Sequence, residues 1–416
     1  MRFGPPLVVR PLLLVPLLVL FATACGGGSS KEDGPSGYPT TGDPGTAEWE
    51  PVPAAQVASE CGLDPELLAT ADAEIGRSFA VVRYGKLCHE HYPAGEPQVD
   101  ERTEVFSASK TLGGVVTGVA AYQTRDLPRT GRKTGPILDD DRVDHWLDEF
   151  SFNPDAQIAH VLAMIAHNAD LTPGERTYAY DIDGRVQINR LSDVINTAVA
   201  QDPGRLGANI EEFTQRFLFG PLGMRQSVWS NGDDDKVFAF SWSTTVRDMA
   251  RLGLLLLHGG LWSGERILGE DWVEKLTHPS FEDTNLSYGY LTWLNSPEAD
   301  LASGQAGGDL CSPYAVNHTF PHGLSAATDC GYEIPFTCEQ EKDVGVWYAA
   351  GLFGQYIIGH RGLDLVLVVK DYGDGAGPIR LWNAVRPALV ALDPTFQGDE
   401  AGFCDSYGRG AYAPDL

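Results

Sequence analysis

Phe106-Ser107-Ala108-Ser109-Lys110 is the stretch around which the rest of this 416-residue chain is organised. If Ser107 begins a helix, Lys110 lies one turn further along the same face, with the two Cβ atoms about 5–6 Å apart. An amine so placed can take the proton of the serine hydroxyl, and the helix N-terminus stabilises the developing negative charge. With 21 Ser and 8 Lys, chance alone expects about 0.4 such pairs, and this is the only one in the chain. The rest of the sequence must therefore show whether this pair of residues is a catalytic motif.

The residues after Lys110 favour a long helix that is closely packed. Positions 111–122 are helix-compatible, and Gly113, Gly114 and Gly118 carry no side chain that would hold a neighbour away. We therefore expect another element to pack directly on this helix.

Composition indicates a large globular protein that does not bind nucleic acid. Hydrophobic residues make up 43% of the chain, which is enough for a sizeable core in one or two domains. The formal net charge is −27, and so acidic a surface opposes binding to nucleic acid and to anionic lipid headgroups. Attachment to a membrane would therefore have to come from acyl chains.

The N-terminal segment has the composition of an export signal. Arg2 and Arg10 precede an apolar run, Leu12–Phe21, that is too short and too rich in proline to span a bilayer stably. Small residues directly before Cys25 resemble a bacterial lipobox, which implies removal of residues 1–24 and acylation of Cys25. The alternative is an ordinary secretory signal whose first mature residue is cysteine.

The expected mature protein is a tethered domain outside the cytoplasm. Residues 25–50 are rich in Gly, Ser, Pro and Thr and favour a flexible tether, and residues 51–416 are expected to form the folded domain. We expect export and lipid anchoring to a membrane of the cell envelope. Apart from Cys25, an even number of cysteines remains, which is typical of disulfides in an exported protein. Spacing leaves their connectivity open; we predict the pairs Cys61–Cys88, Cys311–Cys330 and Cys338–Cys404.

Strand patterns occur near both ends of the domain. In the first part, Asp64 can begin a helix that runs to Ile75. The runs 79–83 and 86–92 then have the pattern of a β-hairpin that turns at Tyr84-Gly85.

The middle of the domain is mostly helical, from about residue 136 to 280, and includes an apolar helix at 246–257. A segment at about 296–342 with three cysteines is expected to be an insertion. Strand character is found at 288–293, 356–359 and 363–369, and a closing helix begins at Pro378. We therefore predict an α+β fold in which N- and C-terminal segments form one antiparallel sheet, flanked by helices, beside a central helical lobe.

Acidic and histidine-containing stretches do not indicate a metal site. The runs 139–141 and 233–235 lack the alternating acidic spacing of a calcium loop, so we expect solvated turns. His89 and His91 share one face of a strand without a third ligand, so a solvated strand end is favoured. No metal ion and no organic cofactor is predicted.

Several stretches, taken in order, resemble the serine β-lactamase-like hydrolases. This family contains class C β-lactamases, D-amino-acid peptidases, related esterases and 6-aminohexanoate-oligomer hydrolases. The stretches are 106–111, 162–171 with His167 as a buried structural histidine, 173–174, 178–181, 221–224, 243–250 and 351–355. The resemblance covers roughly residues 60–392. It implies a β-lactamase/transpeptidase-like fold in which Ser107 is the nucleophile and Lys110 activates it.

The second motif of the family presents a tyrosine followed, two residues later, by asparagine or serine. Tyr180 fits best, since Gly184 follows four residues later, and Tyr178 is the competing tyrosine. The resemblance implies that this tyrosine is a general base or proton relay. Position 182 is isoleucine, which departs from the pattern, and Asp181 or Asp183 is a candidate replacement for the polar contact.

The third motif of β-lactamases and transpeptidases is Lys or His, then Thr or Ser, then Gly. Here Gly351-Leu352-Phe353-Gly354-Gln355 resembles the corresponding segment of the esterase and amidase branches. The resemblance implies an oxyanion hole formed by the backbone N–H groups of Ser107 and Gln355. The cation and hydroxyl that would bind a β-lactam or D-alanine carboxylate are missing, although His360 or Arg361 is a candidate cation from the next turn.

The sequence thus predicts a serine hydrolase that cleaves small ester or amide substrates through an acyl-enzyme on Ser107. The nearest alternative is a penicillin-binding D-alanine peptidase or β-lactamase. A second alternative is a catalytically silent, surface-binding lipoprotein that keeps the fold. No obligatory protein partner is inferred.

Overall fold

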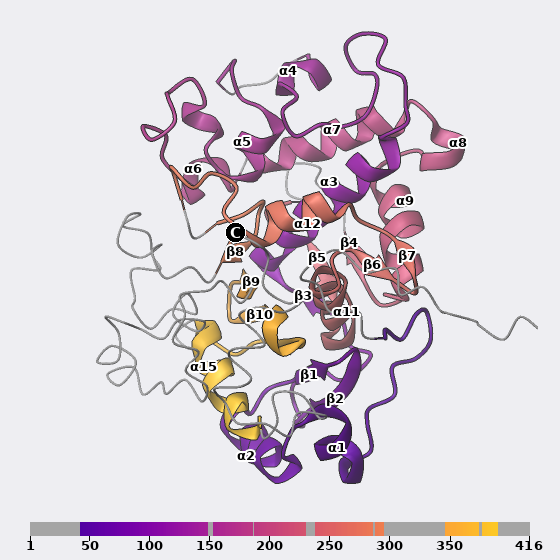
Figure 1. Cartoon of the computed structure of the whole chain (residues 1–416), viewed down its shortest axis with the longest axis vertical. Helices are drawn as coiled ribbons and strands as arrows, with labels where there is room; N and C mark the ends of the chain where they lie inside the picture. Colours follow the sequence, from indigo (N-terminus) through magenta and orange to yellow (C-terminus); the bar gives the residue numbers. More distant parts are fainter. Residues whose placement is uncertain are drawn as a thin grey trace, which may run out of the picture. The chain divides into compact units, whose positions relative to one another are not determined.

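A six-stranded antiparallel sheet joins the two ends of the described chain (Figure 1). The computed structural model describes residues 42–148, 153–185, 187–229, 238–285, 288–294, 346–373 and 377–389, all within the unit Pro35–Leu416. The spatial order of the strands is β2-β1-β11-β10-β9-β8. Their bounds are β1 Phe79–Arg83, β2 Lys86–His91, β8 Trp293–Leu294, β9 Val346–Gly351, β10 Gln355–His360 and β11 Leu365–Val369.

The prediction that N- and C-terminal segments form one sheet is confirmed. β1 pairs with β11, with Phe79 opposite Val369. The hairpin β1–β2 turns where predicted, because Tyr84 and Gly85 both have positive φ (53° and 72°), as a tight two-residue turn requires. Some predictions fall outside the described residues: the signal peptide 1–24, the lipidation site Cys25, the turn 233–235, the insertion 296–342 and the four cysteines 311, 330, 338 and 404.

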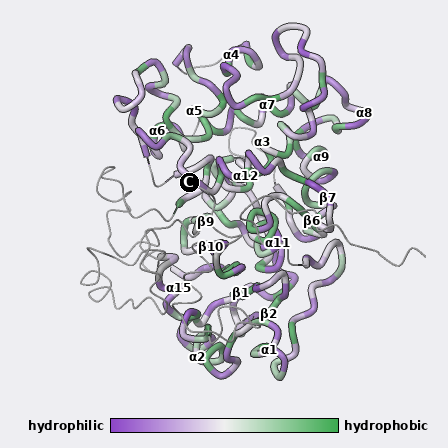
Figure 2. The backbone as a smooth tube through the Cα atoms, in the orientation of Figure 1, coloured by the Kyte–Doolittle hydropathy of each residue, from purple (hydrophilic) through white to green (hydrophobic). Residues whose placement is uncertain are grey.

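Helices cover both faces of the sheet (Figure 1). α11 packs directly on β10 and β11, since a Cβ added at Gly253 would lie 2.6 Å from the side chain of Val366 and 2.9 Å from that of Ile357. α15 packs on α2 and on β11. Consequently every residue of β11 is buried. Figure 2 shows the hydrophobic residues concentrated along α11 and the neighbouring strands.

The remaining helices form the predicted lobe around α3. As predicted, other elements approach its glycines: added Cβ atoms would lie 2.3 Å from Phe238 at Gly113 and 2.2 Å from Trp272 at Gly118. The helix bounds are α1 Val57–Cys61, α2 Pro65–Ile75, α3 Ser109–Thr124, α4 Val143–Trp146, α5 Ile158–Leu162, α6 Tyr180–Asp183, α7 Arg190–Val199, α8 Pro203–Leu206, α9 Ile210–Thr214, α10 Gly220–Leu222, α11 Val246–Leu257, α12 Glu270–Thr277 and α15 Gly377–Val385. The short strands are β3 Thr103–Glu104, β4 Val228–Trp229, β5 Trp242–Thr244, β6 Leu261–Trp262 and β7 Glu265–Arg266.

Two segments differ from the expectation. The strand predicted at 288–293 is reduced to β8, because the backbone N–H of Tyr290 bonds to Lys275 and that of Leu291 to Leu162, both in the lobe. The start of the folded chain also lies earlier than position 51. Asp43 accepts a hydrogen bond from the backbone N–H of Ser263, so this end of the expected tether 25–50 packs on the domain.

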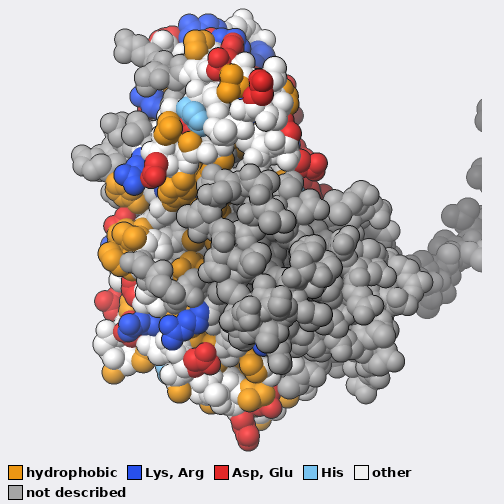
Figure 3. Space-filling view, turned by 90° about the vertical axis from the view of Figure 1, so that its left-hand side faces the viewer, with side chains coloured by type: hydrophobic (Ala, Val, Ile, Leu, Met, Phe, Trp, Pro, Cys, Tyr) orange, Lys and Arg blue, Asp and Glu red, His pale blue; other side chains and the backbone are white. Residues whose placement is uncertain are grey.

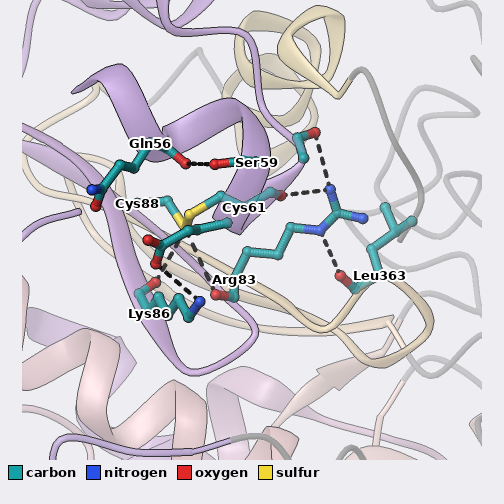
Figure 4. The surroundings of a disulfide bond; sticks show 9 residues. Gln56, Ser59, Cys61, Arg83, Lys86, Cys88 and Leu363 are labelled. Atoms are coloured by element: carbon teal, nitrogen blue, oxygen red, sulfur yellow. Dashed lines mark hydrogen bonds and ion pairs between the residues drawn. A yellow bond between two sulfur atoms is a disulfide. The ribbon is translucent and has the colours of Figure 1, made fainter. Parts of the chain in front are cut away.

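The predicted disulfide between Cys61 and Cys88 is present (Figure 4). It joins the end of α1 to β2, with the Cα atoms 6.1 Å apart. Beside it, the buried guanidinium of Arg83 donates to the backbone carbonyls of Cys61 and Leu363, both at 3.0 Å. These bonds tie the N-terminal hairpin to the C-terminal part of the sheet. No helix in the described ranges has both the length and the hydropathy that a membrane crossing needs.

Candidate active site

Ser107 lies in a 3₁₀ turn, Phe106–Ala108, that leads directly into α3. The α-helix proper therefore begins at Ser109, two residues later than the pattern predicts. Phe106 has φ 49°, a left-handed conformation that costs a non-glycine residue of the order of 1–3 kcal/mol. The turn is held because the N–H of Val105 bonds to the carbonyl of Trp242 in β5, at 2.9 Å. Strain at the residue before a candidate nucleophile is a common feature of functional sites.

Lys110 has the position and the pKa of a general base. Its Nζ lies 3.0 Å from Ser107 Oγ and 2.9 Å from the carbonyl oxygen of Ala239. The side chain is buried, and burial, helped by the positive charge of Arg185, lowers the pKa of Lys110 to about 7. A substantial fraction is therefore neutral at physiological pH, and a neutral amine can accept the serine proton.

Tyr180, the first residue of α6, is the tyrosine that the structure brings to this pair. Lys110 Nζ lies 4.8 Å from the centre of its ring. Burial raises the pKa of Tyr180, whereas its hydrogen bond with Ser107 lowers it. The ring of Tyr178 packs instead against that of Tyr288, 5.0 Å between centroids, and lies 6.1 Å from that of Trp293. The geometry therefore favours the first of the two candidate tyrosines.

The polar partner expected near position 182 is not replaced by either neighbouring aspartate. Ile182 itself is exposed. Asp183 is buried and lies 2.8 Å from His167 Nδ1, so it fixes the histidine that was expected to be structural. Asp181 forms an exposed ion pair with Arg185 at 2.9 Å. The second motif thus contributes its tyrosine, together with an arginine whose charge acts on Lys110 and Tyr180.

Trp293 also contacts the tyrosine. Its ring stacks on Tyr180 at 6.0 Å with an interplanar angle of 22°, and on Tyr348 of β9 at 6.1 Å and 15°. The phenol ring therefore has both the lysine and an indole as neighbours. The sequence placed Trp293 in a strand but contained no spacing that linked it to Tyr180.

Asn189 holds the carbonyl that binds Lys110. Its side chain is buried; Oδ1 accepts from the N–H groups of Phe238 (3.2 Å) and Ala239 (3.0 Å), and Nδ2 donates to the carbonyl of Arg185 (3.0 Å). One amide thus connects the segment after α6 with the segment that contacts the lysine. Asn189 was not predicted, because a single asparagine in a helical region has no distinguishing pattern.

The third-motif segment lies beside the nucleophile. Residues 351–355 form the turn between β9 and β10, closed by a bond of 3.1 Å from the N–H of Gly354 to the carbonyl of Gly351. A Cβ at Gly351 would lie 2.0 Å from the carbonyl oxygen of Val105, so only glycine fits there. The Phe353 ring meets that of Phe106 edge to face, 5.2 Å between centroids.

The expected oxyanion donor, the N–H of Gln355, is not on a free strand edge. Gln355 opens β10, which lies between β9 and β11. The side chain of Gln355 donates to Asp371 at 2.7 Å. Among the described residues, the part of β9 after Tyr348 has no strand on its outer side, since β8 pairs only with Trp347 and Tyr348. The carbonyl of Gly351 faces β10, and alternation along a strand directs the N–H of Ala350 to the opposite side.

The two candidate cations of the next turn, His360 and Arg361, are both buried side chains. His360 is buried, and burial, with the nearby charge of Arg83, lowers its pKa to about 3, so it is neutral at physiological pH. Arg361 is buried and bonds to His278 at 2.9 Å. Among the described residues, no group of three or more His, Cys, Asp or Glu side chains could hold a metal ion; His89 and His91 both contact Asp72, at 2.6 and 3.5 Å.

Comparison with known proteins identifies the fold. No family model matches the sequence. Among solved structures, a Bacillus anthracis protein proposed to be a 6-aminohexanoate-dimer hydrolase is 16% identical, with a TM-score of 0.51 over 85% of this chain and 88% of that one. A family VIII carboxylesterase is 13% identical, with a TM-score of 0.50 over 78% and 97% of the two chains. The chain therefore has the β-lactamase/transpeptidase-like fold that the sequence predicts.

Proposed function

We propose that this protein is a serine hydrolase that cleaves small neutral esters or amides through an acyl-enzyme on Ser107. The observation that carries the proposal is the distance of 3.0 Å between Ser107 Oγ and the Nζ of Lys110, a buried amine whose pKa is lowered to about 7. Tyr180 lies against both groups. Acyl transfer needs a nucleophile, a base and a proton relay in contact with one another, and these three residues supply them.

The reaction proceeds in two stages. Neutral Lys110 takes the proton of Ser107 as Oγ attacks the substrate carbonyl, and the carbonyl oxygen becomes an oxyanion. As the carbon–leaving-group bond breaks, the proton passes through Tyr180 to the departing alcohol or amine, which leaves the acyl group on Oγ. Water then attacks the ester, its proton returns through the same groups, and the free acid departs.

The oxyanion is stabilised by backbone N–H groups, one from Ser107 and one from the free edge of β9. Ala350 is the preferred second donor, because its N–H points away from β10 and no β8 residue pairs with it. This assignment replaces Gln355, whose strand is enclosed on both sides. Removal of one such donor from a hydrolase typically costs a factor of about 10²–10³ in kcat.

Neutral substrates fit the site better than anionic ones. Leu352 and Phe353 occupy the turn next to Ser107 and carry no charge, and Arg185 is already paired with Asp181. An unpaired carboxylate in such surroundings is costly. This favours esters and amides over β-lactams or peptides that end in D-alanine.

Labelling with a fluorophosphonate tests the proposal. The wild-type protein should be modified on Ser107. The Ser107→Ala variant should not be labelled, and its rate of ester hydrolysis should be lower by several orders of magnitude. The matched control is Ser109→Ala, which removes a buried acceptor for the N–H of Trp242 and so lowers stability by about 1–3 kcal/mol while keeping the label. Full activity in Ser107→Ala would overturn the mechanism.

Export and lipid anchoring are part of the same proposal. They rest on the sequence around Cys25 and on the even number of remaining cysteines. In phase partition with a nonionic detergent, the wild-type protein should enter the detergent phase and Cys25→Ala the aqueous phase. Recovery of both proteins in the aqueous phase would contradict the anchor.

A further inference from the structure

Exposed hydrophobic side chains occur in the segments that carry the candidate site. Among the described residues, seven large hydrophobic side chains are exposed. Four of them we call the apolar rim: Ile182 (54% exposed), Phe240 (37%), Leu352 (53%) and Phe353 (48%). Single exposed hydrophobic residues need no explanation, whereas several around one reactive group do.

Each residue of the apolar rim is close in the sequence to a residue of the candidate site or of its surroundings. Ile182 follows Tyr180 by two residues in α6, and Phe240 directly follows Ala239, whose carbonyl accepts from Lys110. Leu352 and Phe353 form the turn that packs against the residues before Ser107. The rim therefore comes from three separate segments, each of which also carries a residue of the candidate site or a neighbour of Ser107. Figure 3 shows hydrophobic side chains interspersed with charged ones on the described part of the face that it presents.

We infer that the apolar rim binds the acyl chain of the substrate, so that the preferred substrates are neutral esters of apolar acids with several carbon atoms rather than acetates. The inference rests on the proposed function, because the acyl carbon must reach Ser107 Oγ. The rest of the chain then extends over side chains that offer apolar contact and no charge.

The expected size of the effect follows from apolar burial. A fully buried methylene contributes about 0.8 kcal/mol, or about fourfold in kcat/KM. Because the rim is open to solvent, we expect about half of that free energy, or about twofold for each methylene. From acetate to hexanoate, four methylenes longer, kcat/KM should therefore rise by about tenfold or more.

The test uses the full chain in detergent below saturating substrate, with p-nitrophenyl acetate, butyrate and hexanoate. The wild-type protein should show the rise with chain length, and Leu352→Ser and Ile182→Ser should each reduce the hexanoate-to-acetate ratio at least threefold. The matched control is Leu67→Ser on α2, a leucine that is 38% exposed and not part of the rim, which should leave the ratio unchanged.

Three outcomes would contradict the inference. A kcat/KM for the acetate equal to that for the hexanoate in the wild-type protein would overturn the proposed role of the rim while leaving the proposed function intact. A ratio unchanged in both rim variants would do the same. Absence of both turnover and fluorophosphonate labelling would instead overturn the proposed function, and this inference with it.

Discussion

Asn189 and Lys110 do not touch, yet the amide of the first holds the peptide group that binds the second. Asn189 Oδ1 accepts from the N–H of Ala239 at 3.0 Å, and the carbonyl of the same residue accepts from Lys110 Nζ at 2.9 Å. The lysine therefore has a fixed acceptor in addition to Ser107. This acceptor stabilises the ammonium form and opposes the effect of burial on the lysine.

Asn189→Ala should impair turnover as well as stability. Two buried N–H groups and one carbonyl lose their partner, which costs about 1–3 kcal/mol for each group that stays unsatisfied. Without a fixed carbonyl the ammonium of Lys110 is less stable, so the acidic limb of the pH–kcat profile should move to lower pH and kcat should fall about tenfold. The control is Asn196→Ala, which removes a similar bond, to the N–H of Ile210, elsewhere in the lobe. Its pH profile should not change; an identical shift in both variants would indicate a general loss of packing.

The activity should depend on pH through Lys110. Because its pKa is lowered to about 7, the lysine is protonated below that pH and cannot accept the serine proton. For a neutral ester, kcat/KM should fall about tenfold per pH unit below pH 7 and level off above it. A flat profile between pH 5 and 8 would exclude Lys110 as the base.

Arg185→Gln should move this limb to higher pH. The charge of Arg185 is one of the causes that lower the pKa of Lys110, so its removal raises that pKa. Arg185 is largely exposed, and the shift should therefore shrink in high salt. Arg205→Gln on α8, another exposed ion-paired arginine, is the control and should leave the profile in place.

The local parts of the site were predictable and the long-range parts were not. Ser107 and Lys110 are three residues apart, so their proximity follows from one helical turn. The hairpin turn at Tyr84-Gly85 likewise depends only on these two residues. Asn189 and Trp293 act across large sequence separations through backbone and ring contacts that no local pattern records. The expected position of Gln355 on a strand edge was wrong for the same reason, since a turn motif does not reveal which of its two strands lies at the sheet edge.

Removing the hydroxyl group from each tyrosine in turn distinguishes the two candidates of the second motif. Tyr180→Phe keeps the ring that contacts Lys110 and Trp293 but removes the hydroxyl that bonds to Ser107. We expect kcat to fall by about 10²–10⁴ with little change in stability. Tyr178→Phe, whose hydroxyl contacts Tyr288, should change kcat less than threefold. A larger loss in the second variant would reverse the assignment.

The disulfide Cys61–Cys88 should contribute stability without affecting the chemistry. It closes a loop with a sequence separation of 27, for which the chain-entropy model gives about 3.5 kcal/mol. The double variant Cys61→Ala/Cys88→Ala should lose about that free energy of unfolding in urea and keep kcat. Thiol titration of the denatured, unreduced Cys25→Ala protein, with its other cysteines intact and purified after export, should find few or no free thiols. Unchanged stability in the double variant would show that the bond constrains nothing.

Specificity for neutral substrates is the last consequence of the turn at 351–355. Leu352 and Phe353 stand beside Ser107 without a cation, and His360 and Arg361 are buried elsewhere. We expect neutral esters to exceed nitrocefin in kcat/KM by at least a hundredfold, since a bound carboxylate would be left without a partner.

Phe353→Lys should reverse part of this preference. The variant supplies an ammonium group at an exposed position of the turn, so KM for the p-nitrophenyl monoester of succinate should fall severalfold, and the gain should disappear in high salt because surface charges are screened. Phe353→Gln, which is similar in length but neutral, is the control and should leave that KM unchanged. Wild-type hydrolysis of nitrocefin as efficient as that of the best ester would show that the site binds the carboxylate by another route, and the preference for neutral substrates would be wrong.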